Sequence, residues 1–143
     1  MDLKFYKNKG MEAFSREEWE MICSGCGLCC LEKLIDEESN EIILTRVACK
    51  YLNLSDLRCM VYEKRLIKKK DCMKIDLSFL EKYKDCLPEI CSYRILYITG
   101  ELPHWHYLES GDRELVHKLG ISALNNVVSG ENIHPDDLQY FIW

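Results

Sequence analysis

The sequence predicts a small α+β domain that is mainly helical, with short strands and irregular segments organised around a cysteine metal site. Three observations lead to this expectation: a length of 143 residues, several short helical patterns beside one β-branched run, and nine cysteines, four of them within eight residues. A chain of this length fits one domain, residues 1–143, and buries an ordinary core without help from a metal.

The first helix is predicted just before the densest group of cysteines. Ser15 and Glu18 have the spacing of a capping box, and Phe14 and Trp19 have that of a hydrophobic staple. A short helix through Trp19 should therefore run directly into Cys23.

One stretch has a clear strand pattern. Residues 41–47 are rich in β-branched side chains and lie between polar segments. Residues 31–40 are acidic and favour a turn, and residues 59–70 favour irregular chain or a short strand. Further helices are predicted over 77–83, from Pro88 to a stop at Gly100, over 115–128, and from Pro135 through Phe141.

Composition excludes several classes of function. The first nine residues are charged and interrupted, and no later stretch is apolar enough for a membrane span, so a cytoplasmic protein is expected. The net charge is −5 and the acids and bases are interspersed, which argues against nucleic acid as a partner. The run Lys68-Lys69-Lys70 is interpreted as a solvated face. The expected partner is a metal ion, with neither nucleic acid nor a membrane.

The spacing of the first four cysteines points to a metal site. Cys23, Cys26 and Cys29 follow one another at intervals of three, and Cys30 stands directly beside Cys29. Two intervening residues let two sulfurs reach one metal, in zinc sites and iron-sulfur clusters alike. Thiols in the cytosol stay reduced, so such a cluster favours metal binding over disulfides. The two glycines inside the run allow the backbone to turn tightly around a shared centre.

The remaining cysteines are dispersed, at positions 49, 59, 72, 86 and 91. Together with the first four they would suffice for two four-sulfur zinc sites, or for one iron-sulfur cluster with an auxiliary site. Isolated cysteines also serve as small buried hydrophobes, and that interpretation is preferred for Cys86. Arg65 and Arg94 are candidates to compensate the charge of the thiolates.

The run Cys23-Ser24-Gly25-Cys26-Gly27-Leu28-Cys29-Cys30 resembles the CxxCxxCC signature of a family of zinc- or iron-chelating cysteine-cluster proteins, in its YcgN-like branch. The similarity covers nearly the whole chain, through Cys49, Cys59-Met60-Val61-Tyr62-Glu63-Lys64-Arg65, Asp71-Cys72, Cys91-Ser92-Tyr93-Arg94 and Leu102-Pro103-His104-Trp105-His106. This resemblance implies that Cys49, Cys59, Cys72 and Cys91 are ligands. It supports metal chelation and implies no reaction.

Two positions depart from the family pattern. Members of the branch tend to carry a Cys-x-Cys pair where this chain has Leu57 and Cys59, and Cys86 has no counterpart. A site that required sulfur at position 57 would therefore be incomplete here.

Other chemistry finds little support. His104 and His106 alternate about Trp105, a spacing that could direct both rings toward a metal, although a loop histidine bound to backbone is the more ordinary interpretation of His104. No serine-hydrolase elbow, phosphate-binding loop or HExxH helix is present. Four residues, Asp36, Glu37, Glu38 and Glu41, favour an acidic surface loop over a carboxylate iron site.

The function predicted from sequence is chelation of zinc or iron by clustered thiolates, and the alternative is an iron-sulfur component of electron transfer or redox catalysis. Sulfur ligands alone do not separate zinc from iron, because both accept tetrahedral thiolate sets. Whether a reaction is catalysed stays open. Cys23, Cys26 and Cys29 are expected to share one centre, completed by at least one downstream cysteine. The full set of predicted ligands is Cys23, Cys26, Cys29, Cys30, Cys49, Cys59, Cys72 and Cys91.

Overall fold

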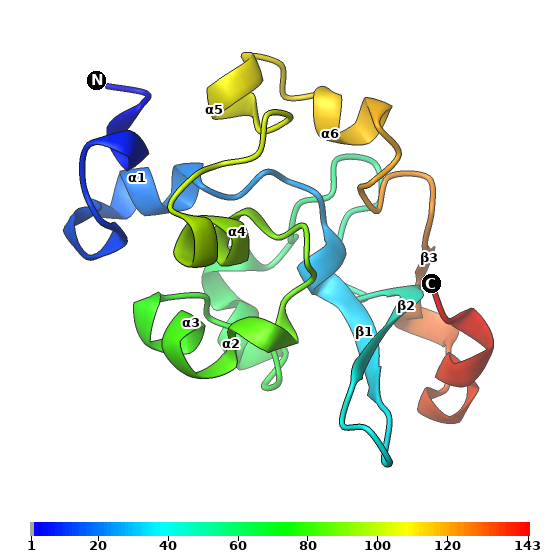
Figure 1. The fold of residues 1–143 in the computed structure, drawn as a ribbon. Helices are drawn as coiled ribbons and strands as arrows, with labels where there is room; N and C mark the ends of the chain where they lie inside the picture. Colours follow the sequence, from blue (N-terminus) through cyan, green and yellow to red (C-terminus); the bar gives the residue numbers. More distant parts are fainter. Residues whose placement is uncertain (1) are drawn as a thin grey trace. The chain divides into compact units, whose positions relative to one another are not determined.

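A computed structural model describes residues 2–143 and confirms an α+β protein in which short helices accompany a small sheet (Figure 1). The chain forms two compact units, each built from separate stretches of sequence. Unit 1 comprises residues 2–26 and Met73–Ile121, and unit 2 comprises Gly27–Cys72 and Ser122–Trp143. The expectation of one domain stays a prediction.

Unit 1 begins with the predicted capping box. The Ser15 hydroxyl accepts the Glu18 amide at 3.1 Å, and the Glu18 carboxylate accepts the Ser15 amide at 2.9 Å. These bonds start α1, Arg16–Met21. The rings of Phe14 and Trp19 lie 6.4 Å apart, as the staple predicts. Tyr93 then donates its hydroxyl hydrogen to the Trp19 carbonyl, which ties α1 to the second half of the unit.

The helices of the second half of unit 1 pack their apolar side chains inward. Helix α3, Leu77–Tyr83, matches its prediction and is capped by Asp76. Helix α4, Ser92–Thr99, ends at Gly100 as predicted but starts four residues after Pro88, because residues 88–91 form a turn closed by the bond from the Cys91 amide to the Pro88 carbonyl. The main core side chains of this unit are Ile22, Leu80, Leu87, Tyr93, Leu96, Trp105 and Val116.

Two further short helices complete unit 1. They are α5, Tyr107–Ser110, and α6, Leu115–Lys118. The prediction of helix through residue 128 was wrong, because α6 stops after one turn and residues Val128–Ser129 form strand β3 of unit 2. Among residues 2–143, no helix is both long enough and apolar enough to cross a membrane.

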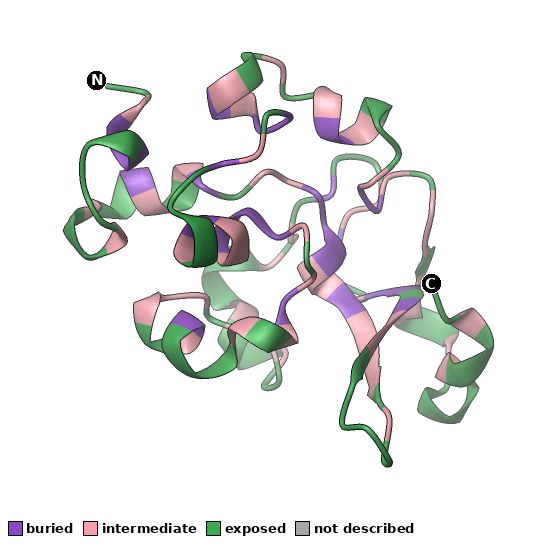
Figure 2. Cartoon of the chain, in the orientation of Figure 1, coloured by how far each residue is buried: buried purple, intermediate pink, exposed green. Residues whose placement is uncertain are grey.

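Unit 2 is organised by a sheet in the order β1-β2-β3. Strand β2, Ile42–Ala48, confirms the predicted strand. Strand β1, Leu31–Ile35, occupies half of the stretch predicted as a turn, because pairing with β2 overrides its polar composition. The two run antiparallel and Leu31 pairs with Ala48, while β3 runs parallel to β2. Leu31 of β1 and Thr45, Val47 and Ala48 of β2 are buried and contribute to the core. Figure 2 colours the buried residues of the chain purple.

The remaining elements of unit 2 are short. Helix α2, Arg65–Lys68, follows a 3₁₀ turn at Tyr62–Lys64, where irregular chain or strand was expected. Pro135–Phe141 is a 3₁₀ helix. After it, Ile142 bridges to Thr45 of β2, and the Trp143 amide donates to the Leu44 carbonyl at 2.9 Å.

One carboxylate joins the start of the chain to α5 in unit 1. Glu109 accepts the Tyr6 hydroxyl and lies 3.3 Å from the ammonium groups of both Lys4 and Lys7. The bond from Tyr6, followed by those from the two lysines, lowers the pKa of Glu109 to about 2. The ionised carboxylate therefore stabilises this part of the fold.

We expect Glu109→Gln to lower the free energy of unfolding at pH 7 by about 1.5 to 3 kcal/mol, since it removes hydrogen bonds to a charged acceptor. The Glu109 pKa is lower in the folded state, so its contribution is complete above the unfolded pKa of 4.5 and is lost as pH falls toward 2. Urea unfolding at pH 7 and pH 3 measures both effects. Glu81→Gln, at an exposed position on α3, is the control. Equal unfolding midpoints for the two variants at pH 7 would contradict the assignment.

Candidate metal centre

The two glycines of the cysteine run make the turns predicted for them. Gly25 and Gly27 have φ values of 79° and 74°, a region that L side chains rarely adopt. In unit 2, a Cβ on Gly27 would lie 3.3 Å from the Ala123 Cβ and 3.4 Å from a methyl of Leu57. The Leu57 side chain, at the position where the family pattern has sulfur, therefore packs beside the cysteine run.

Cys30 and Cys49 lie side by side at the end of the β1–β2 ladder. A 3₁₀ turn, Leu28–Cys30, delivers Cys29 and Cys30 immediately before β1, and Cys49 follows β2 directly. Beyond the pair of Leu31 and Ala48, the Cys49 amide donates to the Cys30 carbonyl at 2.8 Å. The antiparallel register thus brings together two cysteines nineteen positions apart in sequence.

Cys59 is placed by the next turn of the chain. The Leu52 amide donates to the Cys49 carbonyl at 2.9 Å, and Leu52 then forms an antiparallel bridge with Cys59. The Met60 amide also donates to the Tyr51 carbonyl at 2.8 Å. Cys59 therefore lies beside Leu52, the residue whose amide is bonded to Cys49.

Cys72 is placed by an ion pair with the sheet. The Lys69 ammonium bonds the Glu32 carboxylate of β1 at 2.6 Å, and the Cys72 amide donates to the Lys69 carbonyl at 3.0 Å. Lys69 is thus half-buried, and the interpretation of residues 68–70 as a solvated face holds for Lys68 and Lys70 only. Sequence reasoning missed this lysine because its partner lies 37 positions away.

The thiols of unit 2 influence one another electrostatically. Cys30 holds its proton in a hydrogen bond to Cys29, which lowers the pKa of Cys29 and raises that of Cys30. Burial and the charges of Cys29, Cys49 and Cys72 raise the pKa of Cys30 further. Burial raises the pKa of Cys72, with contributions from Cys59, Cys49 and Cys29. Unit 2 therefore gathers five of the predicted ligands: Cys29, Cys30, Cys49, Cys59 and Cys72.

Two cations lie beside these thiols. Lys33 bonds the Cys29 and Leu31 carbonyls at 3.1 and 2.9 Å, and its charge helps to lower the pKa of Cys29. The charge of Arg65 acts on Cys72 in the same direction. Arg65 thus has the compensating position expected of it, and Lys33 was missed.

The other cysteines belong to unit 1. Cys23 is exposed and Cys26 is buried after α1, while Cys91 is buried at the N-cap of α4. Cys86 lies in a 3₁₀ turn before it. The second candidate cation, Arg94, bonds the Leu87 carbonyl at 2.6 Å and lies 3.6 Å from Asp85.

The unit boundary falls inside the cysteine run, between Cys26 and Gly27. The prediction that Cys23, Cys26 and Cys29 share one centre therefore stays a prediction. All nine cysteines are thiols, and none forms a disulfide within the described chain. In the same residues 2–143, no three cysteine, histidine, aspartate or glutamate side chains already stand in the arrangement that a bound metal ion needs.

His106 is engaged on both ring nitrogens. Its Nδ1 accepts the Leu108 amide at 3.1 Å and caps α5, so the neutral ring carries its proton on Nε2, which donates to the Ile22 carbonyl at 2.8 Å. This arrangement leaves no nitrogen for a metal. His104 is exposed, as expected for a loop histidine.

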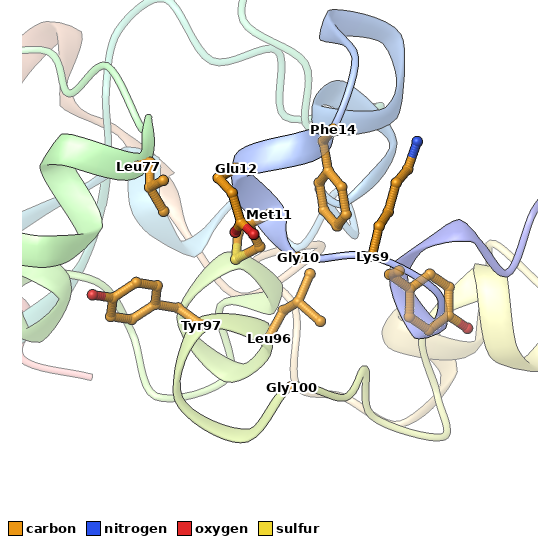
Figure 3. A pocket seen from close by; sticks show the side chains of 10 residues that line it. Lys9, Gly10, Met11, Glu12, Phe14, Leu77, Leu96, Tyr97 and Gly100 are labelled. Atoms are coloured by element: carbon orange, nitrogen blue, oxygen red, sulfur yellow. The ribbon is translucent and has the colours of Figure 1, made fainter.

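Unit 1 contains a pocket of about 260 Å³ that no cysteine lines. Met11 and Phe14 from the start of the chain lie across it from Leu96 and Tyr97 of α4 (Figure 3). Its lining contains neither cysteine nor histidine, so it does not contribute thiolate or imidazole ligands.

Comparison with known proteins places the chain in a family. It is 41% identical over 133 residues to a UPF0260 protein of Pseudomonas putida, covering 93% of this chain and 88% of that one. It is 40% identical over 141 residues to a UPF0260 protein of Agrobacterium fabrum, covering 99% and 86%. The chain belongs to the UPF0260 family.

A third UPF0260 protein, from Pseudomonas fluorescens, is 38% identical over 138 residues, or 96% of this chain and 92% of that one. No family model matches the chain, and no solved structure matches it. The name UPF0260 states no ligand and no reaction. Chelation through the cysteine run is therefore a separate inference, which rests on the chain's own residues.

Protonation of His106 should destabilise unit 1. Burial lowers the His106 pKa, and a second proton on Nδ1 would oppose the Leu108 amide. Because the folded pKa is the lower one, stability is complete above the unfolded pKa of about 6.5 and declines as pH falls below it, until the folded pKa is reached.

We expect His106→Asn to keep the cap through its amide oxygen, to lose the bond to Ile22, and to cost about 1 to 3 kcal/mol at pH 7.5. It should also remove the contribution of His106 to the loss of stability between pH 7.5 and 5.5. Urea midpoints at the two pH values measure both effects, and His104→Asn is the matched control. An unchanged pH dependence in His106→Asn would exclude His106 as its source.

Proposed function

We propose that this chain chelates zinc or iron through cysteine thiolates, in the cytoplasm, with Cys29, Cys30, Cys49, Cys59 and Cys72 as the donor set of unit 2. One observation carries the proposal: the end of the β1–β2 ladder sets Cys30 beside Cys49, within electrostatic reach of Cys29 and Cys72. Five sulfurs gathered from four separate stretches exceed what packing of a small core requires.

The donor set fits a thiolate-bound metal. Soft sulfur ligands favour zinc and iron-sulfur centres over magnesium or calcium. Thiols whose charges act on one another do not all ionise readily, because each thiolate raises the pKa of the next, whereas a bound cation removes that penalty. Lys33 and Arg65 supply further positive charge beside Cys29 and Cys72. Cys23, Cys26 and Cys91 are the ligands proposed in unit 1.

An iron-sulfur component for electron transfer is the second candidate, because the same sulfurs could hold a cluster. Anaerobic purification followed by a visible spectrum, metal analysis and acid-labile sulfide separates the two. A colourless protein with stoichiometric zinc supports the binding protein. A brown protein with iron and sulfide supports the redox component, and a protein with neither metal contradicts both.

Cys49→Ser should lower the metal bound per chain, because a neutral hydroxyl replaces a thiolate at the centre of the proposed set. Cys86→Ser is the matched control, since Cys86 lies in unit 1 outside the family pattern. It should leave bound metal unchanged and cost at most about 1 to 3 kcal/mol if the hydroxyl stays unpaired. Metal analysis of the two purified variants beside the wild type gives the answer. Undiminished metal in Cys49→Ser would contradict the unit 2 donor set.

Cys26→Ser tests the ligands proposed in unit 1. It should release metal and weaken any folding that depends on it, again with Cys86→Ser as the reference. Metal content and thermal unfolding of the two variants are compared side by side. Equal loss of metal in both would make Cys86 a ligand and would overturn its assignment as a spare cysteine.

A further inference from the structure

Unit 2 carries a basic segment, residues 58–70, in which the proposed metal site accounts for Cys59, Arg65 and Lys69 but not for the remaining cations. It contains six basic residues and one acidic residue, a net charge of +5 in a chain whose total is −5. Apolar side chains accompany this charge: Met60, Leu66 and Ile67 are 60%, 45% and 78% exposed. Exposed aliphatic groups beside concentrated charge are typical of a surface that binds another protein.

The same unit carries a surface of opposite charge. The acidic tip, residues 36–41, joins β1 to β2 and contains four acidic residues and no basic one. Ile35 and Ile42 flank it and are 66% and 36% exposed. Figure 2 shows the end of this hairpin as exposed chain. The Asp36 carboxylate accepts the Glu38 and Ser39 amides, whereas Glu37 and Glu38 present their side chains to solvent.

Few of these charges form ion pairs within the described part of the chain. Within residues 2–143, the basic segment forms one ion pair, between Lys69 and Glu32, and the acidic tip forms none. Lys64, Lys68 and Lys70 are exposed. The cations and the carboxylates thus have room for partners from another molecule.

We propose that the basic segment of one copy binds the acidic tip of a second copy, so that the chain forms a two-fold symmetric dimer. Both surfaces combine charge with exposed aliphatic side chains, and their charges are opposite.

The spacing of the two surfaces suits this symmetry. Lys69 joins the basic segment to Glu32 near the start of β1. Asp36, the first residue of the acidic tip, follows Glu32 by four residues, which is about 13 Å along the strand at roughly 3.3 Å per residue. A copy laid antiparallel beside the first would therefore set each tip against the other copy's basic segment. A two-fold axis forms both contacts at once, which closes the assembly at two chains.

Charge reversal tests the pairing directly. One variant carries Glu37→Lys and Glu38→Lys, and the other carries Lys68→Glu and Lys70→Glu; all four positions are exposed, so the fold should be unaffected. The protein as purified, with its metal and under reducing conditions, is measured by sedimentation velocity from micromolar to submillimolar concentration. We expect a wild-type dimer at about 0.05 M salt that weakens at about 0.5 M, since screening reduces the attraction.

Each reversed variant alone should bind itself at least about tenfold more weakly than the wild type, because its changes remove most of the opposite charge at both contacts and place the substituted side chains against residues of their own sign. An equimolar mixture of the two should recover the dimer, because one contact then keeps its native charges and the other sets the two introduced lysines against the two introduced glutamates. Glu81→Lys with Glu89→Lys, exposed positions in unit 1, makes the same change in net charge as Glu37→Lys with Glu38→Lys and should leave dimerisation unchanged.

A wild type that stays monomeric throughout overturns the proposal, as does a dimer indifferent to both reversals or a mixture that does not recover. Vesicles of anionic phosphatidylglycerol provide a further arm. Binding of the monomeric wild type to them, abolished by Lys68→Glu with Lys70→Glu, would assign the basic segment to a membrane surface instead and equally overturn the dimer.

Discussion

The hydrogen bond from the Cys49 amide to the Cys30 carbonyl extends the β1–β2 ladder past the strands and sets the position of the cysteines in unit 2. Its register depends on which side chains face the core. Leu31 and Ala48, the last pair before it, are buried, so a slip of one residue would expose them. The hydrophobic core therefore fixes the register of the two strands, and this register places Cys30 beside Cys49.

The cationic groups near these thiols depend on the same sheet. Lys33 is a residue of β1, and Lys69 is held within electrostatic reach of Cys49 because its partner Glu32 is the preceding residue of that strand. Positive charge is thus supplied from the scaffold itself, although the chain as a whole is acidic. Such a local balance is what a group of sulfur ligands needs, since their charge is unfavourable unless nearby cations oppose it.

Local signals in the sequence predicted the elements that local interactions create. The capping box before α1, the β-branched run of β2 and the stop at Gly100 all act within a few residues, and all were correct. Strand β1 was missed because Glu32 and Lys33 give it a polar composition, and pairing with β2 decides its conformation. The same holds for side-chain contacts: spacing predicts the cysteines as ligands, which stays a prediction, whereas the second bond of His106 joins residues 84 positions apart. No local pattern contains that information.

Bound metal would stabilise the irregular stretch of unit 2 more than the sheet of unit 2 or the helices of unit 1. The sheet of unit 2 and the helices of unit 1 have buried apolar cores of their own. The stretch that carries Cys49, Cys59 and Cys72 has only a 3₁₀ turn and the four-residue α2, elements too short to be stable in isolation. The Lys69–Glu32 pair joins this stretch to β1, and Leu52 and Leu57 are its buried side chains. Segments with few packed side chains open first in a native protein, so thiolate coordination would add most stability here, where the fold itself supplies least.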